Sequence, residues 1–259
     1  MYSDRQLREI FHFHFLEHLL RMTDVNMFVL KGGVNLRFFF HSPRYSEDMD
    51  LDVLQGSVAT VRKNGYKLLS DAAFLRGMRT FGITNIDINS PDRAKHTETT
   101  QRFRVQLVSS SGQRLPSKVE FSRRPAGKST VAGAALVEQL DAELARQYNR
   151  LNFRCQHYGA DAAIAQKLLA LAGRAVTQAR DVFDVQILQR ACYGRNLALG
   201  QVLAAQQRET ALENLASLSY DDYAGQVLEF LDPESLAEHR GREAWSAMVD
   251  SVRALLQPP

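Results

Sequence analysis

The sequence predicts an α+β protein with two domains, an N-terminal domain over residues 1–131 and an all-helical domain over residues 132–259. In the first part, short apolar runs alternate with glycine turns and with segments of helical spacing, which is typical of a sheet flanked by helices. From residue 132 onward the apolar residues recur only at helical intervals, and we expect no further strand there. A sheet-containing unit followed by a series of helices belongs to the α+β class.

The first helix is predicted to begin at Ser3, because Ser3 and Gln6 form an S-x-x-Q capping box, and to end near Met22. The order predicted after it is a strand at 27–30, a glycine turn, a short helix at 34–40 and a strand at 45–53. A helix at 59–79, a strand at 82–89 and a hairpin formed by 103–108 and 118–122 follow.

The composition is that of an ordinary globular protein, with 45% hydrophobic and 24% charged residues. No stretch approaches the roughly 20 apolar residues that a membrane span needs. The first 20 residues carry charges throughout and lack a small-residue cleavage site, so we expect no secretory signal. The two cysteines, Cys155 and Cys192, show no CxxC spacing, which argues against a zinc site or a disulfide framework. A reducing cytoplasm is the expected location.

The net charge of +3 does not by itself predict a nucleic-acid partner, but many basic residues gather near the predicted hairpin. Such a patch can steer a polyanion toward a nearby site. A solvated strand face with extended side chains explains the same charges equally well. The residues concerned are Arg102, Arg104, Arg114, Lys118, Arg123, Arg124 and Lys128.

Three aspartates alternate along the strand predicted at 45–53, namely Asp48, Asp50 and Asp52. Alternate side chains of a strand share one face, at intervals of roughly 6.6–7 Å. Carboxylates gathered in this way repel one another, and a divalent cation such as Mg²⁺ removes that cost. Two such ions can hold the attacking and leaving oxygens of a phosphoryl transfer. The spacing alone is also consistent with surface charge.

A Gly32-Gly33 turn precedes these acids by fewer than 20 residues. Free backbone N–H groups at Gly33, Val34 and the start of the following helix can bind a phosphate. The Walker A pattern is absent, because no GK[ST] follows the glycines. The strand–turn–helix–strand order therefore predicts a site for a metal-bound nucleoside triphosphate.

Two pairs of motifs carry a resemblance to a known family. LKGGVNLR at 30–37 and RYSEDMDLD at 44–52 resemble the LKGGT and RfSeDlDfD signature of the AbiEii/AbiGii-type nucleotidyltransferase toxins. AQKLLALAGR at 165–174 and ARDVFDV at 179–185 are similar to that family's distal block. The family belongs to the DNA polymerase β-like nucleotidyltransferase superfamily. The resemblance implies a mixed-sheet nucleotidyltransferase core followed by the all-helical domain.

The resemblance also implies roles for individual residues. Asp48 and Asp50 match the metal-binding acids, and Glu120 falls where the superfamily often supplies a third carboxylate, with Asp52 left open as the alternative third ligand. The catalytic residues implied are Asp48, Asp50, Lys167 and Asp184. The nucleotide-binding residues implied are Lys31, Gly32, Gly33, Arg44, Ser46, Lys167 and Arg174. Val34 departs from the family's usual hydroxyl residue, and we expect weaker triphosphate binding as a result.

The distal block can also be interpreted without the family. Lys167 and Arg174 are two helical turns apart and share a face, where they could neutralise charge on a transferring phosphate. A solvated basic stripe is the alternative interpretation. Asp181 could simply favour a helix N-terminus, whereas Asp184 is surrounded by apolar residues and is expected to be the more buried and functional of the two.

The implied reaction is metal-dependent nucleotide transfer from an NTP to the 3′ end of tRNA, with Mg²⁺ or Mn²⁺ as cofactor and an antitoxin protein as partner. Two alternatives remain open: the same chemistry on a protein or a small molecule, and a non-catalytic RNA- or nucleotide-binding relative. His14, Glu17 and His18 share a helical face but lack the HExxH order and a third ligand nearby, so we interpret them as interfacial residues rather than a metal site.

Overall fold

A computed structural model describes residues 2–90, 94, 96–123, 135–192 and 203–257. The chain forms two compact units: Met1–Phe39 with Tyr45–Tyr158, and Phe40–Arg44 with Gly159–Pro259. The sequence predicts the division after residue 131 instead. The difference arises because residues 135–158 complete the sheet of the first unit, and because a five-residue segment upstream joins the second.

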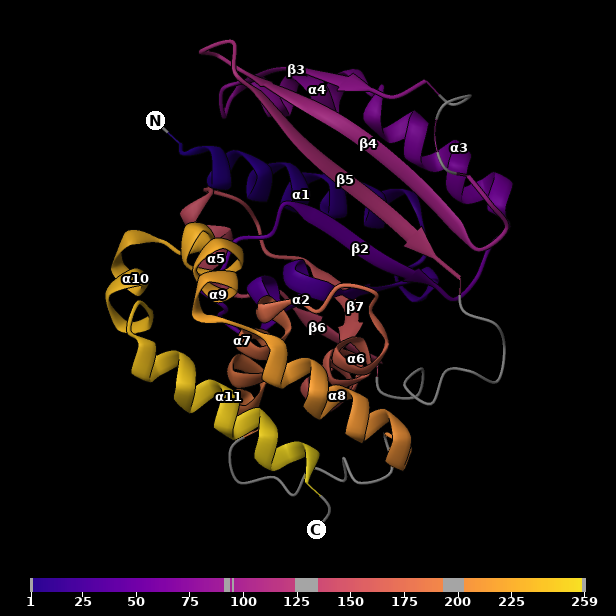
Figure 1. Cartoon of the computed structure of the whole chain (residues 1–259). Helices are drawn as coiled ribbons and strands as arrows, with labels where there is room; N and C mark the ends of the chain where they lie inside the picture. The colour runs from indigo at the N-terminus through magenta and orange to yellow at the C-terminus, as the bar shows by residue number, and fades with distance from the viewer. Residues whose placement is uncertain (1, 91–93, 95, 124–134, 193–202, 258–259) are drawn as a thin grey trace. The chain divides into compact units, whose positions relative to one another are not determined.

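The first unit is built around a seven-stranded mixed sheet with strand order β3-β4-β5-β2-β1-β7-β6 (Figure 1). β1 pairs with β2 antiparallel and with β7 parallel, and β2 pairs with β5 parallel. The strands are β1 (Phe28–Lys31), β2 (Asp48–Val53), β3 (Ile83–Ile88), β4 (Thr100–Ser109), β5 (Arg114–Ser122), β6 (Ala135–Gln139) and β7 (Arg154–Tyr158). The predicted mixed-sheet core is confirmed.

β6 and β7 contradict the expectation of no strand after residue 132. β6 is an edge strand that pairs only with β7 among the described strands, and its residues are mostly exposed. β7 is five residues long, and its apolar residues do not alternate clearly with polar ones. Short strands of this kind carry little periodic signal, so their position in the sheet comes from the pairing of β7 with β1 and of β6 with β7 and not from local pattern.

The helices of the first unit are α1 (Asp4–Met22), α2 (Gly32–Phe39), α3 (Val58–Leu69), α4 (Ala72–Arg79) and α5 (Ala142–Gln147), with a short 3₁₀ helix at Val25–Met27. The capping box at the start of α1 is confirmed, with both of its hydrogen bonds present. The single helix predicted at 59–79 is two helices, because Asp71 accepts a hydrogen bond from the Phe74 N–H and caps a new helix there.

The main core of this unit lies between the sheet and the helices. α1 contacts α3, α4 and β5, α3 contacts β4, and α4 contacts β3. Gly65 of α3 lies directly against the ring of Phe103 on β4, so the apolar face of β4 points toward the helices. Arg102 and Arg104, which alternate with Phe103, therefore lie on the opposite face of the sheet.

The second unit contains the helices from Ala160 onward, as the sequence predicts for the C-terminal part. α6 contacts α7 and α8, and α11 contacts α7 and α8. The helices are α6 (Ala160–Gly173), α7 (Ala179–Ala191), α8 (Ala205–Ser217), α9 (Tyr220–Gln226), α10 (Pro233–His239) and α11 (Arg242–Leu256), with a 3₁₀ helix at Leu228–Phe230. The segment 40–44 joins this unit through a β-bridge between Arg44 and Leu231. None of the described helices is long and apolar enough to cross a membrane.

Candidate active site

The predicted acids lie in cross-strand register at the centre of the sheet. Asp50 on β2 is paired with Lys31 on β1 on one side and with Glu120 on β5 on the other. Glu120 is paired in turn with Arg102 on β4. Residues in register on adjacent strands project from the same face. The sheet thus places a row of four charged residues across four neighbouring strands, with the acids Asp50 and Glu120 in the middle and a basic residue at each end.

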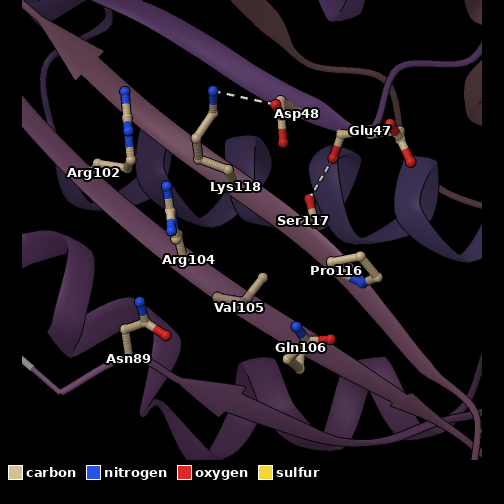
Figure 2. A pocket seen from close by; sticks show the side chains of 10 residues that line it. All are labelled: Glu47, Asp48, Asn89, Arg102, Arg104, Val105, Gln106, Pro116, Ser117 and Lys118. Carbon is tan, nitrogen blue, oxygen red and sulfur yellow. Dashed lines mark hydrogen bonds and ion pairs between the residues drawn. The ribbon is translucent and has the colours of Figure 1, made fainter. Parts of the chain in front are cut away.

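A second row runs parallel to the first, from Asp48 through Lys118 to Arg104. The Lys118 Nζ lies 3.2 Å from the Asp48 Oδ2 and 4.0 Å from the Glu120 Oε2. Figure 2 shows the Lys118 side chain directed toward Asp48. The Arg102 Nε donates to the Glu120 Oε2 at 2.6 Å. Lys118 and Arg102 therefore compensate part of the negative charge that the carboxylates bring together.

Asp50 is the exception among these acids. Burial raises the pKa of Asp50 above its usual value, and the neighbouring Glu120 and Asp48 act in the same direction, whereas Lys118 and Lys31 oppose the shift. No residue in the described part of the chain donates a hydrogen bond to its carboxylate or forms an ion pair with it. A half-buried carboxylate without a donor is costly, and a bound cation is the usual compensation.

Asp52, left open by the sequence, is already engaged. One of its oxygens accepts from the Lys31 Nζ at 2.5 Å and the other accepts from the Tyr158 hydroxyl at 2.8 Å. Asp48, by contrast, has a side chain that is 43% exposed. Asp48 and Asp50 therefore fit the one or two carboxylates that Mg²⁺ takes beside substrate phosphates. Glu120 fits less well as a ligand, because Arg102 holds one of its oxygens.

Gly32 brings the predicted phosphate-binding turn against this site. Its φ of 71° lies in the left-handed region, which glycine adopts without a steric cost. A Cβ built on Gly32 would lie 3.2 Å from the Asp50 Oδ2. α2 begins at this residue, so the free N–H groups of its first turn start beside the Asp50 carboxylate. The predicted proximity of glycine turn and acids is present.

Replacing Gly32 with alanine should lower both stability and activity. The left-handed backbone costs an L-residue roughly 1–2 kcal/mol, and the new methyl group would press on the Asp50 carboxylate. A small displacement of a reacting group can cost about 10²-fold in rate. The matched control is Gly77→Ala on α4, where a Cβ meets nothing within 4 Å and a gain of about 0.4–1 kcal/mol is expected. Thermal unfolding and nucleotide-transfer rates measure both effects, and equal behaviour of the two variants would contradict this role of Gly32.

Two other predicted nucleotide-binding residues, Lys31 and Ser46, have protein partners. Lys31 pairs with Asp52, as described above. The Ser46 hydroxyl donates to the Asp48 carbonyl oxygen at 2.8 Å, which holds the entry to β2. Val34 is 2% exposed and belongs to the hydrophobic core, so a hydroxyl at this position would be buried with it. The expected weaker triphosphate binding that follows from Val34 stays a prediction.

His14, Glu17 and His18 form the one group of three His, Cys, Asp or Glu side chains in the described residues whose ligand atoms all lie within 4.8 Å of one another. Glu17 accepts from Arg21 at 2.7 Å and from Arg150 at 2.8 Å. Burial, and then the charges of Arg150, His18 and Arg21, lower the pKa of His14 to about 3. The two guanidinium groups that cover Glu17 disfavour a further cation, which agrees with an interfacial role for these residues.

The remaining predicted residues form a buried ion-pair network in the second unit. Arg44 makes a bidentate contact with Asp184, with its Nη2 at 3.0 Å from both carboxylate oxygens. Lys167 donates to Asp181 at 2.9 Å and lies 2.6 Å from the Asp184 Oδ2. The Arg174 Nε completes the network at 3.2 Å from the Asp181 Oδ2. The prediction that Asp184 is the more buried of the two aspartates is wrong, because Asp181 and Asp184 are both 0% exposed.

The network fixes the charge states of its members. Burial alone would raise the pKa of Asp184, but Arg44 and Lys167 outweigh it and hold that pKa below its usual value. Burial would likewise lower the pKa of Lys167, but Asp181 and Asp184 raise it. The Asp184 carboxylate and the Lys167 ammonium group are therefore both charged and stabilise each other. The catalytic assignment of Lys167 and Asp184 stays a prediction, while the contacts give them a structural role.

Sequence reasoning missed two contributions to the acid site. Tyr158 binds Asp52 from a strand 106 residues away in sequence, and no local signal marks such a pair. Lys118 and Arg102 were noticed only as part of a basic patch. Their alternation with buried Val119 and Phe103 does place them on the face of the acids. Two other members of that patch, Arg124 and Lys128, lie outside the described residues.

Comparison with solved structures supports the fold. MenT4, a nucleotidyltransferase toxin from Mycobacterium tuberculosis, is 20% identical with a TM-score of 0.58, over 98% of this chain and 84% of that chain. An antigenic nucleotidyltransferase-like protein from Paracoccidioides brasiliensis is 12% identical with a TM-score of 0.50, over 89% and 97% of the two chains. At such identities the likeness shows the fold alone. No match was found among curated proteins.

Family comparison by sequence covers nearly the whole chain. The sequence model described as nucleotidyl transferase AbiEii toxin of type IV TA systems matches residues 14–259. The matched range includes the glycine turn, the acids of β2 and β5, and the ion-pair network of the second unit. The resemblance seen in the motifs is thereby confirmed, and the chain belongs to the AbiEii family of nucleotidyltransferase toxins.

Proposed function

We propose that this protein transfers a nucleotidyl group from an NTP to the 3′ end of an RNA, with tRNA as the expected acceptor and Mg²⁺ or Mn²⁺ as the cofactor. The observation that carries the proposal is the Asp50 carboxylate, which is half-buried, has no described hydrogen-bond donor, and lies between Asp48 and the Gly32 turn. This combination suits a metal-bound triphosphate better than it suits a structural role.

The proposed reaction is an in-line substitution at the α-phosphorus of the NTP. The oxygen of the acceptor hydroxyl forms the new bond, the bond from the α-phosphorus to the bridging oxygen breaks, and pyrophosphate leaves with the electron pair. The hydroxyl proton passes to a carboxylate or to water. A divalent ion held by Asp48 and Asp50 would lower the pKa of the hydroxyl and neutralise charge on the phosphates.

The chain's own residues supply the orientation. The N–H groups at the start of α2, next to Gly32, are placed to hold phosphate oxygens beside Asp50. Lys118 neutralises Asp48 in the protein alone and is placed to contact a phosphate that enters the site. Lys31 and Tyr158 fix Asp52, which borders the acids on β2 and keeps the strand end rigid. Asp52 acts in this account as a positioning residue.

The choice of RNA over a protein or small-molecule acceptor rests on charge. Cationic side chains of β4 and β5 project from the same face as the acids, as Figure 2 shows for Arg102, Arg104 and Lys118. A polyanionic acceptor would be attracted to such a face, whereas a small neutral acceptor has no use for it. Membership of a toxin family of TA systems further supports a neutralising antitoxin as the protein partner.

The test is incubation of the purified protein with each α-labelled NTP and with separated tRNA, total protein and small-molecule fractions. We expect label on tRNA, abolished by EDTA and restored by excess Mg²⁺ or Mn²⁺. Label confined to the protein or small-molecule fraction would overturn the acceptor class and leave the chemistry standing. Absence of metal-dependent label from every fraction would overturn the catalytic function and favour a binding protein.

A further inference from the structure

An open pocket of about 500 Å³ lies beside the acids on the sheet face opposite the helices (Figure 2). Residues from three neighbouring strands and the loop before β2 line it. Asn89 follows β3, Arg104 and Gln106 are on β4, and Lys118 is on β5. Asp48 forms part of its wall, so the pocket is continuous with the proposed active site.

Three polar side chains that line this pocket, those of Asn89, Arg104 and Gln106, have no hydrogen-bond or ion-pair partner in the described part of the chain, unlike the other basic residues nearby. Arg102 pairs with Glu120, Arg114 pairs with Asp87, and Arg123 donates to the Gly56 carbonyl oxygen. The Arg104 guanidinium is exposed and makes no hydrogen bond or ion pair with any described residue.

The side-chain amides of Asn89 and Gln106 are likewise unpaired in the described part of the chain. Asn89 is held in place through its backbone, whose N–H donates to the Arg104 carbonyl oxygen at 3.1 Å. A free guanidinium beside two free amides offers donors for phosphate and both donors and acceptors for a base edge.

The strand order determines on which side of the acids this pocket lies. From β4 the order runs β5, β2 and β1, so the acids of β5 and β2 separate Arg104 from the glycine turn at the end of β1. Arg104 is two strands from Asp48, roughly 10 Å between backbones. In an in-line substitution the attacking and leaving oxygens stand on opposite sides of the phosphorus. With the triphosphate at the glycine turn, the pocket lies on the acceptor's side.

We infer that this pocket binds the 3′-terminal nucleotides of the RNA acceptor, an inference that rests on the proposed function. Arg104 and Lys118 contact the phosphodiester that precedes the terminal nucleoside, and Asn89 and Gln106 hydrogen bond with a base edge. A guanidinium gives a bidentate phosphate contact, and side-chain amides pair with base edges that carry both a donor and an acceptor. The terminal hydroxyl is thereby directed toward Asp48 and Asp50.

The test uses Arg104→Glu in the full-length protein. The matched charge reversal is Arg79→Glu, at an exposed residue of α4, which packs on the other face of the sheet. The probe is a 5′-labelled single-stranded RNA with a free 3′-hydroxyl, titrated at several salt concentrations. We expect Arg104→Glu to weaken RNA binding about tenfold or more. The slope of log affinity against log salt concentration should fall by about one, the amount expected for the loss of one phosphate contact. Arg79→Glu should bind RNA with the affinity of the native protein. Arg104→Lys should bind with intermediate affinity, because the positive charge remains but the bidentate geometry of the guanidinium group is lost.

The same variants distinguish whether the pocket binds a phosphate of the RNA or a phosphate of the NTP. NTP binding, measured without RNA, should be unchanged in Arg104→Glu, and in turnover KM for RNA should rise while KM for NTP stays constant. Weaker NTP binding with unchanged RNA binding would overturn the inference, because the pocket would then hold the triphosphate. Unchanged binding of both ligands would overturn it as well.

A readout independent of turnover keeps this inference distinct from the proposed function. If the native protein binds RNA through Arg104 but transfers no nucleotide, the proposed function fails and the RNA pocket is supported. If the native protein labels RNA and Arg104→Glu labels it with unchanged KM, the proposed function is supported and the pocket is overturned. Asn89→Ala and Gln106→Ala, tested on RNAs with different terminal bases, should alter base preference more than overall affinity.

Discussion

Replacement of Asp50 by asparagine should lower the rate of nucleotide transfer by about 10³-fold or more, because a metal-bound carboxylate supplies several kcal/mol of charge stabilisation. The amide has nearly the same shape as the carboxylate and removes only the charge. Since burial raises the pKa of Asp50 and no described residue donates to it, the neutral side chain should be tolerated by the fold. The change therefore separates catalysis from stability.

The measurement is the single-turnover rate with saturating NTP and RNA, beside the unfolding temperature of each variant. Asp87→Asn on β3 is the matched control, since Asp87 lies in the same sheet and pairs with Arg114 outside the proposed site. Its rate should equal that of the native protein. A native-like rate in Asp50→Asn would remove Asp50 from the catalytic centre, and a large fall in unfolding temperature would show a structural role instead.

Replacement of Asp184 by asparagine should destabilise the second unit by about 3–5 kcal/mol, the usual cost of breaking a buried ion pair by removing one partner. The change leaves the buried cations Arg44 and Lys167 without the carboxylate that they share. Lys167→Met should have a similar effect, because it removes the cation that contacts both buried carboxylates. Both residues carry a predicted catalytic role. The stability of the two variants therefore tests directly whether Asp184 and Lys167 have a structural role instead.

Chemical denaturation measures this effect, with Asp250→Asn as the control. Asp250 pairs with Arg253 on the surface of α11, and exposed pairs contribute only about 0–1 kcal/mol. A loss for Asp184→Asn no larger than that for Asp250→Asn would contradict the structural role of the network. Variants that fold fully but lose activity would return Lys167 and Asp184 to the catalytic group.

The pH dependence of the same network follows from the directions of its pKa shifts. The lowered pKa of Asp184 means that its contribution is present above its unfolded value of about 3.9 and is lost as the pH falls through the folded value. The raised pKa of Lys167 means that its contribution is present below about 10.4 and is lost as the pH rises above it. The difference in the free energy of unfolding between the native protein and Asp184→Asn should therefore be constant near neutral pH and should become smaller in acid.

Much of the acid site could be predicted because its signals are local. The alternation of Asp48 and Asp50 and the glycine pair at Gly32 are short-range patterns whose geometry follows from a strand and a tight turn. The capping box at Ser3 is local in the same sense. These features appear in the structure where the sequence places them.

Other features could not be predicted because they depend on distant pairing. β7 becomes a strand by lying beside β1, and through Tyr158 it occupies the Asp52 carboxylate that the sequence left open. Arg44 was expected to bind nucleotide because it precedes the acids, yet its partner is Asp184, 140 residues later. Family motifs combine catalytic and structural residues, and only the contacts in the folded chain separate the two.

The most direct test of nucleotidyl transfer at the acids of β2 and β5 compares NTP labelled at the α-phosphate with NTP labelled at the γ-phosphate. Native protein, RNA and Mg²⁺ should place label on the RNA only from the α-labelled NTP and release one pyrophosphate for each nucleotide added. Asp50→Asn should do neither. Label transferred from the γ-phosphate, or RNA left unlabelled by both substrates, would contradict the account.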